Sequence, residues 1–500
     1  MVPMSGWEKS DIQWHYSLTT RADGYQNFIL QNPSLEGRLV CGTPKVLPIL
    51  QFRFNPYNNL DGFLLALTTC DVFHSIQTTA GRQMGCHAGR PCPLRRVVVK
   101  EFFIMLKKTV AQLNVKDIRV LVRVDFNVPL NEQGHITDDR RIVAALPTIK
   151  NIIERGGKAV LMSHLGRPKG GPEAKYSLKP TAIRLGELLK KPVLMADDCI
   201  GPAVVALANG LKSGGILVLE NTRFHKGEEK NESAFAAELA KLGDLYVNDA
   251  FGTAHRQHAS TYGVPAALGA GKRAIGFLIE KELKFLGNAL DHPVRPFVAI
   301  LGGAKVSDKI AVIENLLSKA DTVLIGGAMA YTFFLAQGKK IGKSLCEKDK
   351  VGLAAELLDK AGGKLVLPVD TVISDQISDT AQTQVVAGNI PDDKEGLDIG
   401  PATAELYRAK IASAKTVVWN GPMGVFEKKP FQNGTRVVAE ALASITGHGA
   451  TTIIGGGDSA AAIEQFHLAE KVSHVSTGGG ASLEFMEGRG FPCLDILDNA

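Results

Sequence analysis

Two glycine-rich segments near the end of the chain could bind phosphate groups. The run Gly455-Gly456-Gly457-Asp458-Ser459 follows the strand-like residues 451–454 and precedes a helical pattern at 460–466, and the triplet Gly478-Gly479-Gly480 also follows a short apolar run. Backbone N–H groups at the start of a helix attract anions when no side chain is in the way. Asp458 could hold a Mg²⁺ ion against the bound phosphates. Glycine triplets also form plain turns, so these segments alone do not establish a phosphate site.

A second set of polar residues, far away in the sequence, follows several strand-like apolar runs. In a parallel sheet the carboxyl ends of the strands meet along one edge, so these side chains would gather in one crevice. Several arginines there would bind a small, multiply charged anion through paired hydrogen bonds. A single arginine is more often a solvated surface charge, but repetition after successive strands favours an anion site. The runs and the residues behind them are 120–124 with Asp125, 159–162 with His164, 216–219 with Arg223 and 245–247 with Arg256.

The spacing of apolar residues predicts an α/β fold with two domains. From residue 118 onward, short runs of Val, Ile and Leu alternate with amphipathic stretches, such as 297–301 before 306–317. Doubly wound parallel sheets have this pattern because their strands are buried on both faces. We place a domain boundary at residues 278–296, where the helical pattern 280–286 is stopped by the proline-containing segment 292–296. The 500 residues also exceed what one hydrophobic core usually serves.

The bulk composition agrees with a soluble, two-domain enzyme, and the mildly basic charge fits small anionic substrates better than nucleic acid. The chain has 45% hydrophobic and 22% charged residues, a formal net charge of +6 and a pI near 8.8. It contains no Lys/Arg-rich run that would indicate a nucleic-acid surface and no apolar stretch long enough to span a bilayer. The seven cysteines are scattered, and Cys86 and Cys92 lack CxxC spacing, so the sequence predicts no zinc site. A reduced, cytoplasmic compartment is the expectation.

The motifs behind these strands resemble those of the phosphoglycerate kinase family. The resemblance runs in the family's order from about Met105 to the C-terminus, and no member of the signature set is missing. On the substrate side the motifs are Arg123-Val124-Asp125-Phe126-Asn127-Val128-Pro129, Ser163-His164-Leu165-Gly166-Arg167-Pro168, Glu220-Asn221-Thr222-Arg223-Phe224 and Asp249-Ala250-Phe251-Gly252-Thr253-Ala254-His255-Arg256. On the nucleotide side they are Leu301-Gly302-Gly303-Ala304-Lys305-Val306-Ser307-Asp308-Lys309, Trp419-Asn420-Gly421-Pro422-Met423-Gly424-Val425-Phe426-Glu427 and the two glycine triplets.

The resemblance implies two doubly wound, Rossmann-like domains joined by a hinge helix. It assigns residues 105–277 to a substrate domain, 278–296 to the hinge helix and linker, 297–489 to a nucleotide domain and 490–500 to a segment that returns to the first domain. The implied reaction is reversible phosphoryl transfer between 1,3-bisphosphoglycerate and ADP, giving 3-phosphoglycerate and ATP, in glycolysis, gluconeogenesis or carbon fixation. It also implies Mg²⁺ as cofactor, ATP or ADP as co-substrate and a monomeric enzyme.

The resemblance also assigns individual residues. Such a transfer requires positioning and charge neutralisation rather than a general base, because the carboxylate is already ionised at neutral pH. Catalytic roles fall to Arg141, which faces the transferring group, and to Lys305, Gly457 and Gly480. The substrate site is assigned Asp125, Phe126, Asn127, Arg141, His164, Leu165, Gly166, Arg167, Arg223 and Arg256. The nucleotide site is assigned Lys309, Gly396, Glu427, Gly456, Gly457, Asp458 and Ser459, with Asp458 as the metal ligand.

Three other functions fit the sequence less well. A P-loop NTPase requires GxxxxGK[ST], and the run from Gly338 to Ser344 is one residue short of it. A dinucleotide-dependent oxidoreductase requires GxGxxG after the first strand, which the chain lacks. A binding protein that had lost catalysis would be expected to lose charged groups such as Arg141, Lys305 and Asp458. We therefore expect an active ATP:3-phosphoglycerate phosphotransferase.

Residues 1–104 differ from the rest of the chain. They contain four of the seven cysteines and no sustained alternation of strand and helix patterns. An organellar presequence, an accessory domain and an upstream extension of the reading frame are the three alternatives. A presequence should be poor in acidic residues, but Glu8, Asp11 and Asp23 come early. We favour an extension that is disordered or not part of the mature enzyme, with initiation at Met105; an organellar location is the alternative to the cytoplasm.

Overall fold

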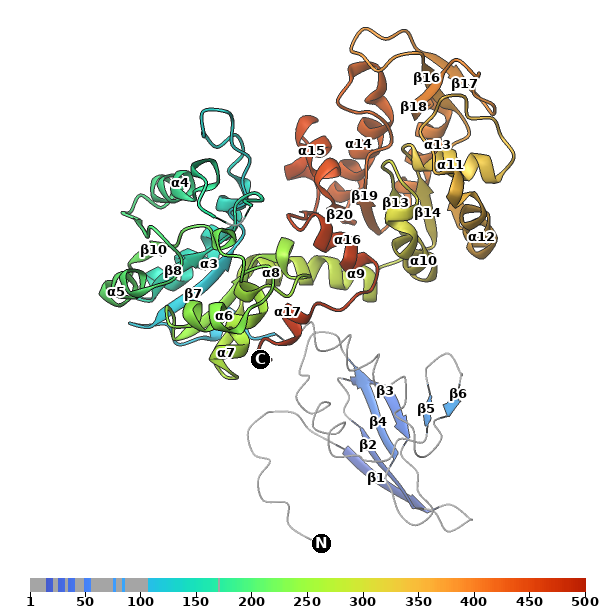
Figure 1. Ribbon diagram of the computed structural model, residues 1–500. Helices are drawn as coiled ribbons and strands as arrows, with labels where there is room; N and C mark the ends of the chain where they lie inside the picture. The colour runs from blue at the N-terminus through green and yellow to red at the C-terminus, as the bar shows by residue number, and fades with distance from the viewer. Residues whose placement is uncertain are drawn as a thin grey trace. The chain divides into compact units, whose positions relative to one another are not determined.

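The computed structural model of the chain describes residues 107–169 and 171–500, together with six strands within the first 106 residues (Figure 1). Residues 1–100 and 101–500 form separate compact units. In the first unit the strands form one sheet in the order β1-β2-β4-β3-β5-β6. Apart from these strands, residues 1–106 lie outside the described part of the chain, and the prediction of an extension over residues 1–104 falls there. These strands are β1 (His15–Thr20), β2 (Gln26–Gln31), β3 (Leu35–Val40), β4 (Ile49–Phe54), β5 (Ser75–Gln77) and β6 (Gln83–Gly85).

The first large sheet of the second unit is wholly parallel. Its strands lie in the order β12-β11-β7-β8-β10-β9, and every neighbouring pair is parallel. The strands are β7 (Arg119–Val124), β8 (Lys158–Met162), β9 (Leu194–Met195), β10 (Ile216–Val218), β11 (Leu245–Asp249) and β12 (Arg273–Ile275).

Helices cover both faces of this sheet, because alternate strand residues point to opposite sides. Val120, Val122 and Val124 of β7 pack in one core cluster with α3 (Arg140–Glu154) and α4 (Lys179–Leu189). Leu121 of β7 packs on the other side, with α5 (Pro202–Gly210) and α6 (Ser233–Ala240). The strands are buried on both faces, which is why they appear in the sequence as unbroken apolar runs.

The second large sheet repeats this architecture. It has the order β15-β14-β13-β19-β20-β21, and its neighbouring strands are again parallel. One face packs against α10 (Ile310–Lys319), α11 (Met329–Ala336) and α12 (Val351–Ala361), and the other against α13 (Pro401–Ala412) and α14 (Asn433–Gly447). The strands are β13 (Phe297–Leu301), β14 (Thr322–Ile325), β15 (Leu365–Val366), β19 (Thr416–Asn420), β20 (Thr451–Gly455) and β21 (His474–Val475). The prediction of two doubly wound domains is confirmed.

A continuous helical segment lies between the two sheets in the sequence. It comprises α8 (Phe277–Glu282), the wider turns of η6 (Leu283–Gly287) and α9 (Asn288–Asp291), which follow one another without a gap. The helical pattern predicted at 280–286 is therefore correct. Its first turn is capped by Asp249, whose Oδ1 accepts the N–H groups of Leu278 at 2.9 Å and Ile279 at 3.3 Å.

One helix begins later than its sequence pattern suggested. The apolar periodicity placed a helix start at Val306, but α10 begins at Ile310 after a short turn at Ser307–Lys309. Glu347 holds this turn by accepting the backbone N–H of Ser307 at 2.9 Å and its hydroxyl. Val306 is fully buried in the preceding loop, so its apolar character reflects packing rather than helix. Lys305 consequently lies in the loop and not at the helix start.

The last residues of the chain contact the first large sheet. The N–H of Lys108 donates to the carbonyl of Asp498 at 2.9 Å, and the Lys107 ammonium donates to the carbonyl of Leu497 at 2.9 Å. Asp498 also forms an ion pair with Arg273 of β12 at 2.9 Å, with both side chains largely buried. Among the described residues, no helix is long and apolar enough to cross a bilayer.

Candidate active site

The carboxyl edge of the first sheet carries the predicted substrate residues. Asp125 follows β7, His164 follows β8, Arg223 lies in η3 (Thr222–Phe224) behind β10, and Arg256 follows β11 after the turn at 251–253. Because these strands are parallel neighbours, the loops behind them open onto one edge of the sheet. The structure thus brings together the set that the sequence predicted there.

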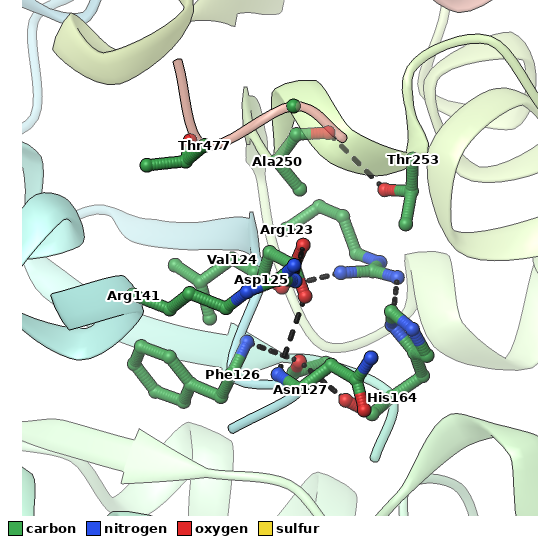
Figure 2. A network of polar contacts seen from close by, with 12 residues as sticks. Arg123, Val124, Asp125, Phe126, Asn127, Arg141, His164, Ala250, Thr253 and Thr477 are labelled. Carbon is green, nitrogen blue, oxygen red and sulfur yellow. Dashed lines mark hydrogen bonds and ion pairs between the residues drawn. The ribbon is translucent and has the colours of Figure 1, made fainter. Parts of the chain in front are cut away.

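Asp125 and Arg141 form an ion pair at this edge (Figure 2). Arg141 is in the first turn of α3, and its guanidinium donates to Oδ2 of Asp125. Burial alone would raise the pKa of Asp125, but the charges of Arg141 and Arg123, together with the backbone N–H of Asn127, outweigh it, and the pKa lies below its usual value. The carboxylate is therefore ionised and holds the Arg141 side chain at the sheet edge.

His164 is buried and neutral. Desolvation lowers its pKa well below the usual value, and the charges of Arg123 and Arg223 lower it further. Arg123 lies 3.1 Å from His164 Nδ1 (Figure 2). A guanidinium can only donate, so Nδ1 accepts and the ring proton sits on Nε2. His164 therefore presents an N–H donor that can bind an anion without carrying a charge.

The predicted arginines differ in their surroundings. Arg223 is buried; its Nη1 donates to the carbonyl of Gly166 at 2.9 Å, and its Nε lies 3.3 Å from the exposed Glu229. Burial lowers the pKa of Arg223, with a further contribution from Arg123 and Arg256. Several cations in a partly desolvated site favour the binding of an anion. Arg167 and Arg256 are both exposed.

Hydrogen bonds from backbone N–H groups to side-chain oxygens fix the loops that carry these side chains. Asn127 Oδ1 accepts the N–H of Gly166 at 2.8 Å, which joins the loop behind β7 to the loop behind β8. The hydroxyl of Ser163 accepts the N–H of Phe126 at 2.8 Å. Leu165 is buried beneath the same loops, at 3% exposure. The apolar motif residues thus support the site, while the polar ones line it.

On the second sheet, the first glycine triplet leads from β20 into α15 (Gly457–Gln465). Gly456 precedes the helix with a φ of +90°, a conformation that favours glycine. Gly457 and Asp458 are exposed in the first turn, while the buried Ser459 accepts the N–H of Gly421 at 2.6 Å through its hydroxyl. The triplet therefore leaves backbone N–H groups and one carboxylate at the start of a nine-residue helix.

Lys309 lies at the same edge, at the start of α10. Its ammonium donates to the side-chain oxygen of Asn420, the last residue of β19. Burial lowers the pKa of Lys309 to about 8, although the charges of Asp458 and Asp308 oppose this shift. Lys305, four residues earlier, is exposed in the loop. The structure thus places Lys309 in the charge environment of Asp458.

The remaining nucleotide-side residues lie on other elements. Gly396 is buried in β18 (Glu395–Ile399), where an added Cβ would lie 2.3 Å from the hydroxyl of Tyr331. Glu427 is exposed in the loop that follows β19. Gly480 is exposed at the start of the short helix α16 (Gly480–Met486).

Contacts within residues 101–500 link elements of the two sheets. Glu282 at the end of α8 is buried; it bonds Nε2 of His474 at 2.8 Å and accepts the N–H of Thr477 at 2.9 Å. Thr477 also lines a small cavity with Asp125 and Arg141. The loop that leads into the second glycine triplet is therefore anchored to the helix between the sheets and borders the substrate-side residues.

Sequence reasoning missed several supporting residues. Arg123 appeared only as part of a motif, yet it sets the proton position of His164. The roles of Asn420 and Glu282 were also not foreseen. For Arg123 the available signal was its place inside the apolar strand Arg119–Val124, where it is fully buried. Buried charges are rare unless they are paired, so such an arginine must have partners in the fold.

Comparisons with known proteins agree with this geometry. The family model described as phosphoglycerate kinase matches residues 110–489. The phosphoglycerate kinase of Rhodopirellula baltica is 59% identical over 400 residues, covering 79% of this chain and all of that protein. The phosphoglycerate kinase of Chlorobium chlorochromatii is 56% identical over 399 residues, with 79% of this chain and 100% of that one covered.

Solved structures give the same result. Phosphoglycerate kinase from Coxiella burnetii has a TM-score of 0.70 at 43% identity, covering 78% of this chain and 98% of that chain. The enzyme from Pyrococcus horikoshii has a TM-score of 0.68 at 35% identity, with the same coverage of 78% and 98%. The family match, the identity to these relatives and the two parallel sheets with their polar carboxyl edges lead to one conclusion: the chain belongs to the phosphoglycerate kinase family.

Proposed function

We propose that the chain transfers a phosphoryl group reversibly between 1,3-bisphosphoglycerate and ADP, giving 3-phosphoglycerate and ATP. The observation that carries this proposal is the chemistry of the two sheet edges. One edge gathers arginines and a neutral histidine, and the other presents a helix N-terminus beside a lysine and a carboxylate. An anionic substrate suits the first edge, and the phosphates of a nucleotide suit the second.

At the substrate edge, the non-transferred phosphate would be held by Arg167, Arg223, Arg256 and the Nε2–H of His164. The neutral histidine adds a donor without adding to the repulsion between the arginines. Asp125 and Asn127 would contact the glycerate portion. The ion pair with Asp125 positions Arg141, which would face the transferring group.

The transfer itself needs no general base. The bond between phosphorus and the acyl oxygen breaks, and the leaving carboxylate keeps the electron pair without needing a proton. A new bond forms between phosphorus and an oxygen of the terminal phosphate of ADP. Charge on the transferring group must be stabilised, and we assign this to Arg141, Lys305 and the backbone N–H groups of Gly457 and Gly480.

At the nucleotide edge, Lys309 and the start of α15 would bind the phosphates, with Gly456 and Ser459 shaping the loop. Gly396 would supply a backbone contact near the adenine, and Glu427 would accept hydrogen bonds from the ribose. Asp458 suits Mg²⁺, because its exposed carboxylate is a hard oxygen donor and makes no hydrogen bond within the described residues. Bound Mg²⁺ would neutralise phosphate charge there.

The domain assignment forms part of the proposal. Residues 105–277 would form the substrate domain and 297–489 the nucleotide domain, with the helical segment between them as hinge and 490–500 returning to the first domain. Direct transfer requires the two edges to approach, and the buried contacts of Glu282 lie where such a hinge would bend. We further propose a monomer in the cytoplasm, with residues 1–104 outside the catalytic unit.

The test is a pair of assays on the purified full chain. ATP formation should require both ADP and 1,3-bisphosphoglycerate, and ADP formation from ATP should require 3-phosphoglycerate. Glycerate without the phosphate should be a poor acceptor, because the arginine cluster would have no partner. Equal rates with acetate or glycerate would refute the assigned substrate class, and ATP hydrolysis without an acceptor would indicate a different reaction.

A further inference from the structure

Three side chains outside the proposed catalytic machinery lie close together at one end of the first sheet. The ligand atoms of Asp198, Cys199 and His225 are all within 4.8 Å of one another. Asp198 and Cys199 are in the loop between β9 and α5, and His225 directly follows η3. None of the three has a part in the transfer described above.

We propose that these residues form a second metal site, for a divalent cation of the Zn²⁺ class. One thiol, one imidazole and one carboxylate make a sulfur, nitrogen and oxygen donor set, which such cations bind well and Mg²⁺ does not. Three protein ligands leave a fourth position for water. The side chains of Asp198 and His225 are 49% and 30% exposed, so a cation can reach the site from solvent.

The three groups are held near a metal-binding arrangement. The ring of His225 stacks on Phe235 with centroids 5.1 Å apart, which fixes the direction of its nitrogens. Its Nε2 lies 2.6 Å from Oδ1 of Asp198, and the same oxygen accepts the N–H of Cys199 at 2.6 Å. Binding therefore requires adjustment of side chains that are already in contact and no movement of distant segments.

The adjustment required of the His225–Asp198 pair is small. Tetrahedral coordination with bonds of about 2.0–2.2 Å places a nitrogen and an oxygen ligand roughly 3.3 Å apart. The present hydrogen bond of 2.6 Å must lengthen by less than about 1 Å to reach that value. Asp198 can supply this movement because its carboxylate is about half exposed, whereas Cys199 is fully buried and His225 is stacked.

The position of the site suggests its effect. His225 is two residues beyond Arg223, and η3 carries Arg223 on a turn capped by Asn221, whose side chain accepts the N–H of Arg223 at 3.0 Å. A cation bound to all three ligands would cross-link this turn to the loop before α5. Binding to the folded state alone raises stability by mass action. The bound cation would thus act on the stability of this turn, and the site is separate from the Mg²⁺ site proposed at Asp458.

Cobalt substitution tests the site directly. The full chain is treated with chelator and reductant and then titrated with Co²⁺, and the near-ultraviolet band that a cobalt–thiolate bond produces is followed. We expect a band with one component that saturates at one equivalent, is absent in Cys199→Ser, is weakened in Asp198→Asn and is displaced by Zn²⁺. Cys493→Ser is the matched control, because Cys493 is equally buried and bonds the carbonyl of Arg256.

The outcomes separate this site from other thiols. The chain has four more cysteines in its first 106 residues, so only the part of the signal that Cys199→Ser removes counts. An identical band in the original chain and in Cys199→Ser would overturn the proposal. Cys199→Ser changes a buried residue and could misfold, so Asp198→Asn provides a second test. Zn²⁺ should raise the melting temperature of the original chain and of Cys493→Ser, and should raise that of Asp198→Asn by a smaller amount. Equal shifts in all three would also overturn it.

Discussion

The buried ammonium of Lys309 gives nucleotide binding a pH dependence that can be calculated. Its pKa is about 8, because burial disfavours the charged form more than Asp458 and Asp308 favour it. A nucleotide phosphate beside the ammonium favours the charged form and would raise this pKa. Above pH 8 the free protein must therefore take up a proton as it binds MgADP.

The size of the effect follows from this pKa. At pH 9 only about a tenth of the free protein carries the proton, so the dissociation constant should rise about tenfold between pH 7 and pH 9. This loss of affinity corresponds to about 1.4 kcal/mol. The nucleotide contributes little to the change, because the last ionisation of a phosphate, near pH 6, is complete.

A change in protein stability through Lys309 would not explain the fall in nucleotide affinity between pH 7 and pH 9. A lysine whose pKa is lowered in the folded state opposes folding below about pH 8, and this cost fades as the pH rises toward the unfolded value of about 10.4. The Lys309 contribution to stability therefore improves over the range in which affinity falls.

The assay is isothermal titration of MgADP in two buffers of different ionisation enthalpy at pH 7, 8 and 9. Proton uptake should approach one per site at pH 9 and vanish at pH 7. Lys309→Arg should remove the uptake, because arginine stays charged at all these values. Lys305→Arg is the matched control and should retain it, since Lys305 is exposed. An affinity independent of pH from 7 to 9, or proton uptake unchanged in Lys309→Arg, would mean that Lys309 is not the group that takes up the proton.

Three further predictions concern single residues. Arg141→Ala should lower kcat by roughly 10² or more with a smaller change in KM, whereas Arg140→Ala, whose partners are the partly exposed Asp138 and Glu464, should be mild in the same steady-state assay. Asp458→Ala should weaken MgADP binding in calorimetry and spare 3-phosphoglycerate binding measured without nucleotide. Asp249→Asn should remove a pH-dependent loss of stability: burial raises the pKa of Asp249 to about 7, so its contribution is complete below about pH 4 and lost as the pH rises to 7. The melting temperature of the variant minus that of the original chain should therefore increase between pH 4 and pH 7.

Each of these three predictions has an outcome that would contradict it. A reversed ranking of the two arginine variants would mean that Arg140, not Arg141, faces the transferring group. Equal loss of nucleotide and 3-phosphoglycerate binding in Asp458→Ala would indicate a folding defect. A melting-temperature difference for Asp249→Asn that is constant across the pH range would show that its carboxyl group is ionised normally.

Parallel sheets explain how much of the site the sequence could predict. Their strands are buried on both faces, so they stand out as apolar runs, and the polar residue behind each run must lie at one edge. Asp125, His164, Arg223 and the triplet before Asp458 were found in this way. Family resemblance then assigned the individual roles, which spacing alone could not have done.

Other features depend on side-chain contacts between distant segments. Asp249 caps the helix that starts at Phe277, and Arg123 bonds a histidine 41 residues away. The start of α10 was misplaced because Val306 is buried in a loop, which produces the same apolar signal as a helix face. No spacing motif joins Cys199 to His225, so that pair becomes visible only when the two loops meet in the fold.

The stereochemistry at phosphorus distinguishes direct transfer between the two substrates from transfer through the protein. Direct transfer requires one in-line displacement between two bound substrates, with charge stabilisation from Arg141, Lys305 and the glycine loops and no covalent intermediate on the protein. Transfer of an isotopically chiral phosphoryl group from ATP to 3-phosphoglycerate should therefore invert its configuration. Retention would mean two successive displacements through a phosphorylated side chain, and would contradict the account.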